Sequence, residues 1–92
     1  MTTINITKDS AKEWVSDIIV MNKPSIAIHI TFEGNPGSVV VERSISGASW
    51  VAAGVVCGIM NESRHVEFGI TGAVVGQKVR IVTNKECRIE YI

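Results

Sequence analysis

The sequence predicts an all-β protein, an antiparallel β-sandwich of seven or eight short strands. Its 92 residues include 13 valines, 13 isoleucines and 6 threonines, but no leucine. β-branched side chains lose rotamer freedom in a helix and pack well on a pleated sheet, so this composition disfavours a helical bundle. Apolar and polar residues alternate with a period of two, and turn-forming residues recur at intervals of roughly 8–12 residues. Both features are typical of a jelly-roll or immunoglobulin-like sandwich.

The first 23 residues carry the weakest pattern. Ile4 and Ile6 alternate with polar residues and predict a short opening strand. Residues 10–13 resemble a helix start, because a serine is followed three residues later by a glutamate, but no helical period continues beyond them. We therefore expect one domain over residues 1–92, in which residues 1–23 are loosely packed or contact a partner.

Two antiparallel hairpins are predicted from alternating runs joined by turn residues. The first joins residues 25–32 to residues 38–45 through a glycine- and proline-containing turn. The second joins residues 78–83 to residues 86–92 through an Asn84-Lys85 turn. Alternation places four apolar side chains on one face of the first strand: Ile26, Ile28, Ile30 and Phe32. On the same reasoning Ile45 shares a face with Val39, Val41 and Arg43.

Two further segments read as strands between these hairpins. Residues 50–60 are apolar on both faces and are interrupted by Gly54 and Gly58, which indicates a bulge or a close approach of two backbones. Residues 64–70 alternate cleanly, with the apolar positions on one face.

The charge balance argues against several classes of partner. Nine Lys and Arg residues oppose nine Asp and Glu residues, so the formal net charge is zero. Nucleic-acid arms and membrane-binding patches need clustered positive charge, and no apolar run approaches the roughly 18–20 residues that span a bilayer. The amino terminus also lacks the pattern of a secretory signal. We expect a protein kept without export, with no nucleic-acid or membrane partner.

Chemically reactive side chains are few. The two histidines, His29 and His65, and the two cysteines, Cys57 and Cys87, show none of the spacings typical of metal sites, which disfavours a four-ligand zinc site. Each histidine occupies the polar side of a predicted strand, which indicates a solvated or hydrogen-bonded ring, and the cysteines read as buried free thiols. The glycines match no phosphate-binding loop. We predict no catalytic residues, no metal and no cofactor.

The two tryptophans allow two interpretations. Trp14 and Trp50 are either core anchors or an exposed platform for sugar rings. In the second case Asn61, Glu62 and Arg64 supply neighbouring polar groups, and the protein is a carbohydrate- or receptor-binding module. Wavelength shifts in tryptophan fluorescence on addition of glycans distinguish the two.

The apolar content favours assembly. Hydrophobic residues make up 46% of the chain, and a domain of this size buries only about 60–65% of its extended surface. Apolar surface left outside such a core usually marks an interface.

Residues 37–50 resemble a pattern found in small structural proteins of tailed bacteriophages. There a strand of the form G-[ST]-V-x-[VL]-[EQ]-R-S precedes a glycine-containing turn and a tryptophan. Residues 76–81 and 88–91 are similar to the later strands of such proteins, so the resemblance covers about residues 24–92. The chain departs from the pattern at Ile45 and Ser46, where an acidic turn residue is usual.

The resemblance implies a virion protein, made in the host cytoplasm, that decorates or cements the capsid or belongs to the tail. It implies self-association, for which we favour a trimer at a capsid symmetry axis, and docking on major capsid or tail proteins.

Four residues of the matching segment form a predicted structural corner: Arg43, Ser44, Gly47 and Trp50. The turn folds the indole of Trp50 back over the aliphatic stem of Arg43, while the guanidinium reaches a carboxylate or carbonyl oxygen. Such a corner is a packing device and implies no binding site.

Overall fold

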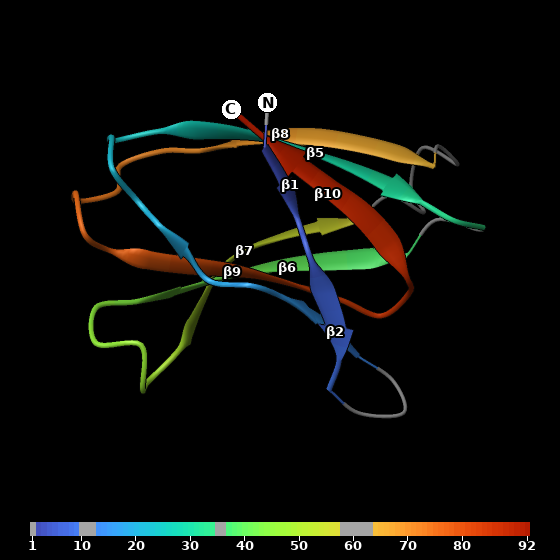
Figure 1. The fold of residues 1–92 in the computed structure, drawn as a ribbon, viewed down its shortest axis with the longest axis horizontal. Coiled ribbons are helices and arrows are strands. Elements are labelled where there is room, and N and C mark those ends of the chain that lie inside the picture. Colours follow the sequence, from blue (N-terminus) through green and yellow to red (C-terminus); the bar gives the residue numbers. More distant parts are fainter. Residues whose placement is uncertain (1, 10–12, 35–36, 58–63) are drawn as a thin grey trace.

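A computed structural model describes residues 2–9, 13–34, 37–57 and 64–92. In these residues the chain forms ten strands, arranged as two antiparallel sheets packed face to face (Figure 1). The described residues include no helix of the length and apolar character needed to cross a membrane. The strands are β1 (Thr2–Ile4), β2 (Ile6–Lys8), β3 (Trp14–Ser16), β4 (Ile19–Val20), β5 (Ile26–Phe32), β6 (Ser38–Ser44), β7 (Val51–Cys57), β8 (His65–Ile70), β9 (Lys78–Thr83) and β10 (Cys87–Tyr91).

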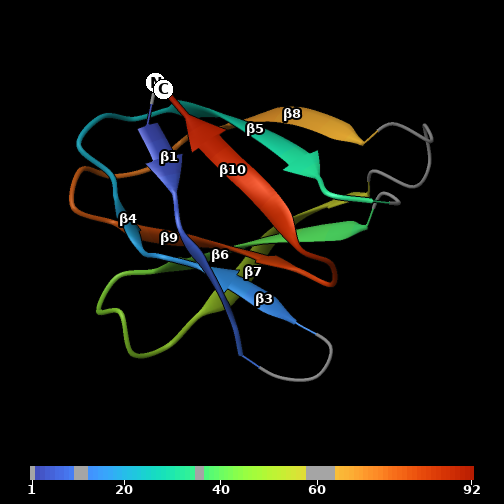
Figure 2. The ribbon, with the colours of Figure 1, turned by 45° about the vertical axis from the view of Figure 1, so that its right-hand side comes forward.

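One sheet has four strands in the order β1-β10-β5-β8, and the other has six. The six-stranded sheet runs β2-β3-β9-β6-β7, with β4 also paired to β9 (Figure 2). The predicted β-sandwich is therefore confirmed. The strands outnumber the seven or eight expected, because the amino-terminal segment forms four short strands, β1 to β4, split between the two sheets.

Both predicted hairpins are wrong. β5 and β6 lie in different sheets, and so do β9 and β10. β5 pairs with β10 on one side and β8 on the other, while β6 pairs with β7 and β9. Each predicted turn instead lies between two strands of opposite sheets. A local turn signal does not specify whether the next strand joins the same sheet or the opposite one.

β6 and β7 form a true hairpin that contains a bulge. Val41 pairs with Gly54 and Glu42 pairs with Ala52, so Ala53 is an extra residue in β7. This confirms the irregularity expected beside Gly54. Gly58 and residues 10–12 of the suggested helix start lie outside the described residues.

The core lies between the sheets and consists mainly of isoleucine and valine. The predicted inner face of β5 is buried along its whole length, and Phe32 is 0% exposed. The amino-terminal segment also contributes core side chains, Ile4, Ile19 and Met21. Cys87 is a buried free thiol whose pKa is raised by burial above the ordinary value of 9.0, so it behaves as a small apolar residue.

A serine side chain completes the six-stranded sheet where β3 ends. β3 pairs with Val82 and Thr83 of β9, whereas β4 pairs with Lys78 and Val79. Between them, the buried Ser16 Oγ accepts the backbone N–H of Ile81 at 2.8 Å and donates to the Asp17 carbonyl at 3.0 Å. The hydroxyl thus takes the place of a missing ladder hydrogen bond.

We expect Ser16→Ala to lower the free energy of unfolding by roughly 1–3 kcal/mol, because it leaves the buried Ile81 N–H without its acceptor. Urea denaturation followed by circular dichroism measures the change. Ser46→Ala is the control, since Ser46 Oγ accepts the Ala48 N–H in an exposed turn. Equal losses in the two variants would contradict this role for Ser16.

Candidate functional site

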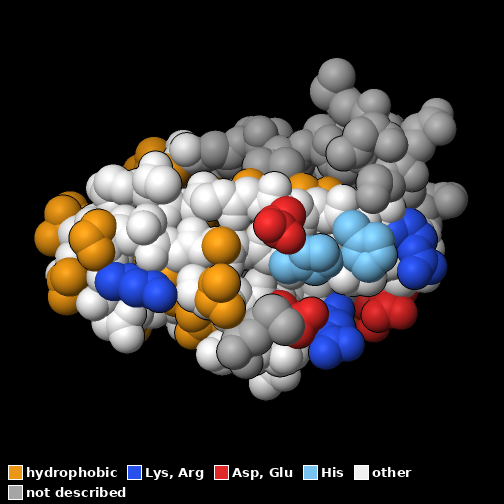
Figure 3. Space-filling view, turned by 90° about the horizontal axis from the view of Figure 1, so that it is seen from above, with side chains coloured by type: hydrophobic (Ala, Val, Ile, Leu, Met, Phe, Trp, Pro, Cys, Tyr) orange, Lys and Arg blue, Asp and Glu red, His pale blue; other side chains and the backbone are white. Residues whose placement is uncertain are grey.

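Two surface regions stand apart from the rest of the molecule. One, which we call the apolar end, consists of Ile45, Val51, Val74 and Val75. These side chains are 86%, 67%, 72% and 64% exposed, respectively. Hydrophobic side chains gather at this end of the sandwich, on the left in Figure 3. The residues come from the β6–β7 hairpin and the β8–β9 loop, and two adjoining hollows connect them.

The β8–β9 loop is tightly anchored although its valines face solvent. It bonds to the segment before β5 and closes on itself through the Gln77 side chain. The bonds are Ala73 N–H to the Pro24 carbonyl (3.1 Å), Gly76 N–H to the Met21 carbonyl (2.7 Å), Met21 N–H to the Gln77 carbonyl (2.9 Å), Gln77 N–H to the Val74 carbonyl (2.9 Å) and Val74 N–H to Gln77 Oε1 (3.2 Å). Val74 and Val75 are therefore held outward by an ordered backbone.

The predicted structural corner supports the part of the apolar end that comes from the β6–β7 hairpin. Ser44 Oγ accepts the Gly47 N–H at 2.8 Å, and Gly47 has a φ of 85°. Arg43 Nη2 donates to the Thr71 carbonyl at 2.6 Å, which ties the end of β6 to the loop after β8 in the opposite sheet. β6 ends at Ser44, so Ile45 leaves the strand and is exposed instead of sharing the buried face of Val41.

A second arginine, not expected from the sequence, lies at Trp50. The guanidinium of Arg80 lies 4.2 Å from the centre of a Trp50 ring. Arg80 Nε also donates to Glu42 Oε1 at 2.6 Å across the β6–β9 pair. Arg43 pairs with the buried Val79, and its buried Nε has no hydrogen-bond partner among the described residues. Strand register places Arg80, two strands away from Trp50, over the indole.

The residues proposed for a glycan surface are not brought together in the described part of the chain. Trp14 lies on β3, near the β1 and β2 side of the sandwich, whereas Arg64 precedes β8 at the opposite edge. Lys8 Nζ lies 5.7 Å from the Trp14 ring centre. Asn61 and Glu62 lie outside the described residues.

The second region is a polar cluster on the outer face of the four-stranded sheet. This histidine cluster comprises His29 and Thr31 of β5 with His65 and Glu67 of β8. His29 Nδ1 lies 3.1 Å from Glu67 Oε2, and His29 Nε2 lies 3.2 Å from His65 Nδ1. Thr31 Oγ1 is 3.3 Å from the same His65 nitrogen. The two rings lie side by side on the surface in Figure 3.

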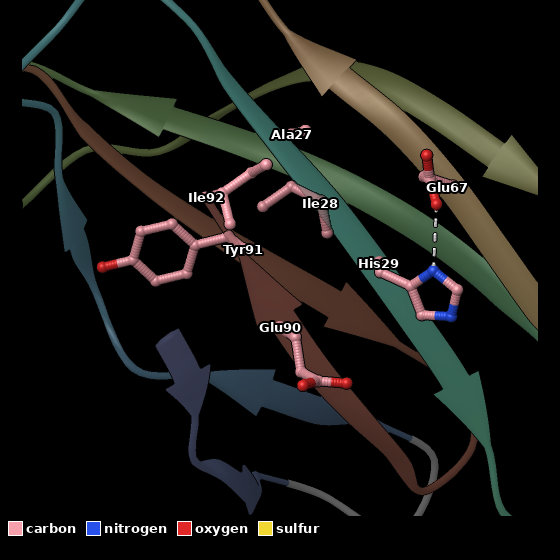
Figure 4. Close-up of a pocket in the computed structure, with 7 residues that line it drawn as sticks. All are labelled: Ala27, Ile28, His29, Glu67, Glu90, Tyr91 and Ile92. Carbon is pink, nitrogen blue, oxygen red and sulfur yellow. Dashed lines mark hydrogen bonds and ion pairs between the residues drawn. The ribbon is translucent and has the colours of Figure 1, made fainter. Parts of the chain in front are cut away.

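A shallow hollow of about 250 Å³ runs beside His29 along β10. Glu90 and Tyr91 line it together with Glu67, and Figure 4 shows the Glu67–His29 contact at its rim. The histidines are 36 residues apart, so no local spacing in the sequence indicates that they meet. Alternation alone placed each of them on an outer face.

Comparison with models of protein families, with curated proteins and with solved structures finds no match to this chain. The geometry above therefore carries the functional argument, together with the resemblance in residues 37–50.

We expect Gly47→Ala to destabilise the protein by about 1–3 kcal/mol, because an alanine at a φ of 85° is strained. Thermal and urea denaturation measure the loss. Gly34→Ala is the matched control: a Cβ there meets no atom within 4 Å, and we expect a change within about 0.5 kcal/mol. Equal stability of the Gly47→Ala and Gly34→Ala variants would show that the turn at residue 47 tolerates another backbone conformation.

Proposed function

We propose that this protein is a non-enzymatic structural protein of a bacteriophage virion that acts by self-association and by docking on other virion proteins. The apolar end is the observation that carries the proposal. Large exposed apolar patches usually mark interfaces. Here the valines sit on a loop held by five hydrogen bonds, so docking requires little further ordering of the backbone.

An edge strand extends the same surface. β7 is the outermost strand of the six-stranded sheet and, among the described strands, pairs with β6 alone. Its outer edge therefore presents backbone groups that a strand from a second molecule can pair with. Val51 belongs both to this strand and to the apolar end, so the edge and the patch are continuous.

The virion assignment rests on the resemblance in residues 37–50 and 76–81. A protein that decorates or cements a capsid, or forms part of a tail, is present in many symmetric copies, and modest contacts repeated by symmetry are sufficient for that task. We favour a trimer. Reading frames for capsid, portal or tail proteins beside this one, and a defined copy number in purified particles by mass spectrometry, would support the assignment. Absence of the chain from such particles would contradict it.

The carbohydrate-binding alternative has weaker support. A cationic side chain lies over a ring of each tryptophan, Lys8 at Trp14 and Arg80 at Trp50, and both indoles are half-buried. Stacking on a sugar needs an open ring face. A glycan-dependent shift of tryptophan fluorescence would favour this alternative over assembly.

Sedimentation equilibrium tests self-association. We expect the wild-type chain of 10.0 kDa to sediment as a trimer at micromolar concentration. Val75→Lys introduces a charge into the apolar end and should shift the equilibrium toward monomer at least tenfold without unfolding the chain. Ile18→Lys is the matched control, because Ile18 is 50% exposed but lies outside that end. A wild-type monomer throughout this range would overturn the proposal.

A further inference from the structure

We propose that His29 and His65 together bind a divalent transition-metal ion, Zn²⁺, Ni²⁺ or Cu²⁺, on the outer face of the four-stranded sheet. The two imidazoles come from the neighbouring strands β5 and β8. His29 is directly opposite Glu67 and His65 is opposite Thr31, so the two histidines are diagonal neighbours across one strand pair. Imidazole nitrogen is a preferred ligand of these three ions.

The distance between the two nitrogens matches the distance between two nitrogen ligands of one metal ion. His29 Nε2 and His65 Nδ1 are 3.2 Å apart. With zinc–nitrogen bonds of about 2.0–2.1 Å and a tetrahedral angle, two ligand nitrogens stand about 3.3 Å apart. The rings are tilted by 51° with centroids 5.3 Å apart, so they approach each other without stacking face to face. A metal can therefore enter with little movement of the backbone.

Glu67 prepares His29 as a ligand. A carboxylate only accepts hydrogen bonds, so the 3.1 Å contact requires the proton of His29 to be on Nδ1. In the neutral ring the other nitrogen, Nε2, carries the lone pair, and it lies 3.2 Å from His65 Nδ1. A carboxylate that holds the second nitrogen of a metal-binding histidine is a common outer-shell arrangement, and it orients the ring.

Two carboxylates and one guanidinium lie near His29. Glu67 and Glu90 lie on either side of His29, on β8 and β10, at directly paired positions. Arg88, on β10 opposite Thr31, is engaged 3.6 Å from Glu90. Among the described residues, no group of three His, Cys, Asp or Glu side chains converges on one point. The site is thus a two-nitrogen chelate in which water completes the coordination shell.

Metal binding requires one proton to move. A 3.2 Å contact between two ring nitrogens requires a proton on one of them, His29 Nε2 or His65 Nδ1. Both nitrogens must offer a lone pair to the metal, so that proton is released to solvent.

Isothermal titration with ZnCl₂ and NiCl₂ tests the site in the full chain at neutral pH. We expect one ion per chain, and a loss of more than a hundredfold in affinity in His29→Ala and in His65→Ala. Cys87→Ala should bind as the wild type does, because this thiol is buried in the core. Unchanged affinity in either histidine variant, or no binding by the folded wild-type chain, would overturn the proposal.

Glu67 is tested as a positioning residue. Glu67→Ala should weaken metal binding by about 10–100-fold, whereas Glu67→Gln should restore most of it because the amide oxygen still accepts from Nδ1. Nitrogen-15 NMR of the imidazoles in the wild type should show the His29 Nε2 and His65 Nδ1 signals shifting together on addition of Zn²⁺, with the proton on His29 Nδ1 retained. Circular dichroism confirms that each variant is folded. Equal affinities in the wild type and in Glu67→Ala, or an unchanged His65 Nδ1 signal, would contradict the arrangement.

Discussion

The whole fold depends on one interaction, the burial of β-branched side chains between the two sheets and away from water. The longest strands in the described part of the chain have seven residues, and short strands are not stable unless a second layer covers their apolar face. Burial of each isoleucine or valine contributes about 1.5–3 kcal/mol relative to exposure. Ile30, Ile81 and Ile89, from three different strands, are completely buried in that layer. The sheets hold each other in register through this contact.

This layer also decides what the surface presents. Because Ile28, Ile30 and Val66 face inward, the intervening His29 and His65 must face outward on adjacent strands, where they meet. At the end of the sandwich, Ala73 turns into the core and the two following valines turn out of it. The histidine cluster and the apolar end are thus consequences of the same inward packing, although one is polar and the other apolar.

Alternation in the sequence was sufficient to identify inner and outer faces but not strand partners. The buried residues of β5 follow from their spacing, and so does the outward position of each histidine. The partners of β5 do not follow, because β10 and β8 are distant in sequence and the turn after Phe32 leads to the opposite sheet. The same limit explains why Arg80, which register places over Trp50, was not expected there.

By itself, the sequence determined the all-β class, the apolar inner faces and the points at which the chain turns, because these depend on side-chain chemistry over a few neighbouring residues. Only the tertiary structure decided that β5 and β6, and likewise β9 and β10, lie in different sheets, that Arg43 ties β6 to the loop after β8, and that two histidines 36 residues apart lie side by side. Those outcomes depend on which of several similar apolar strands pack together. The combined burial of all these strands decides which of them pack together, so no single segment of the sequence specifies the arrangement.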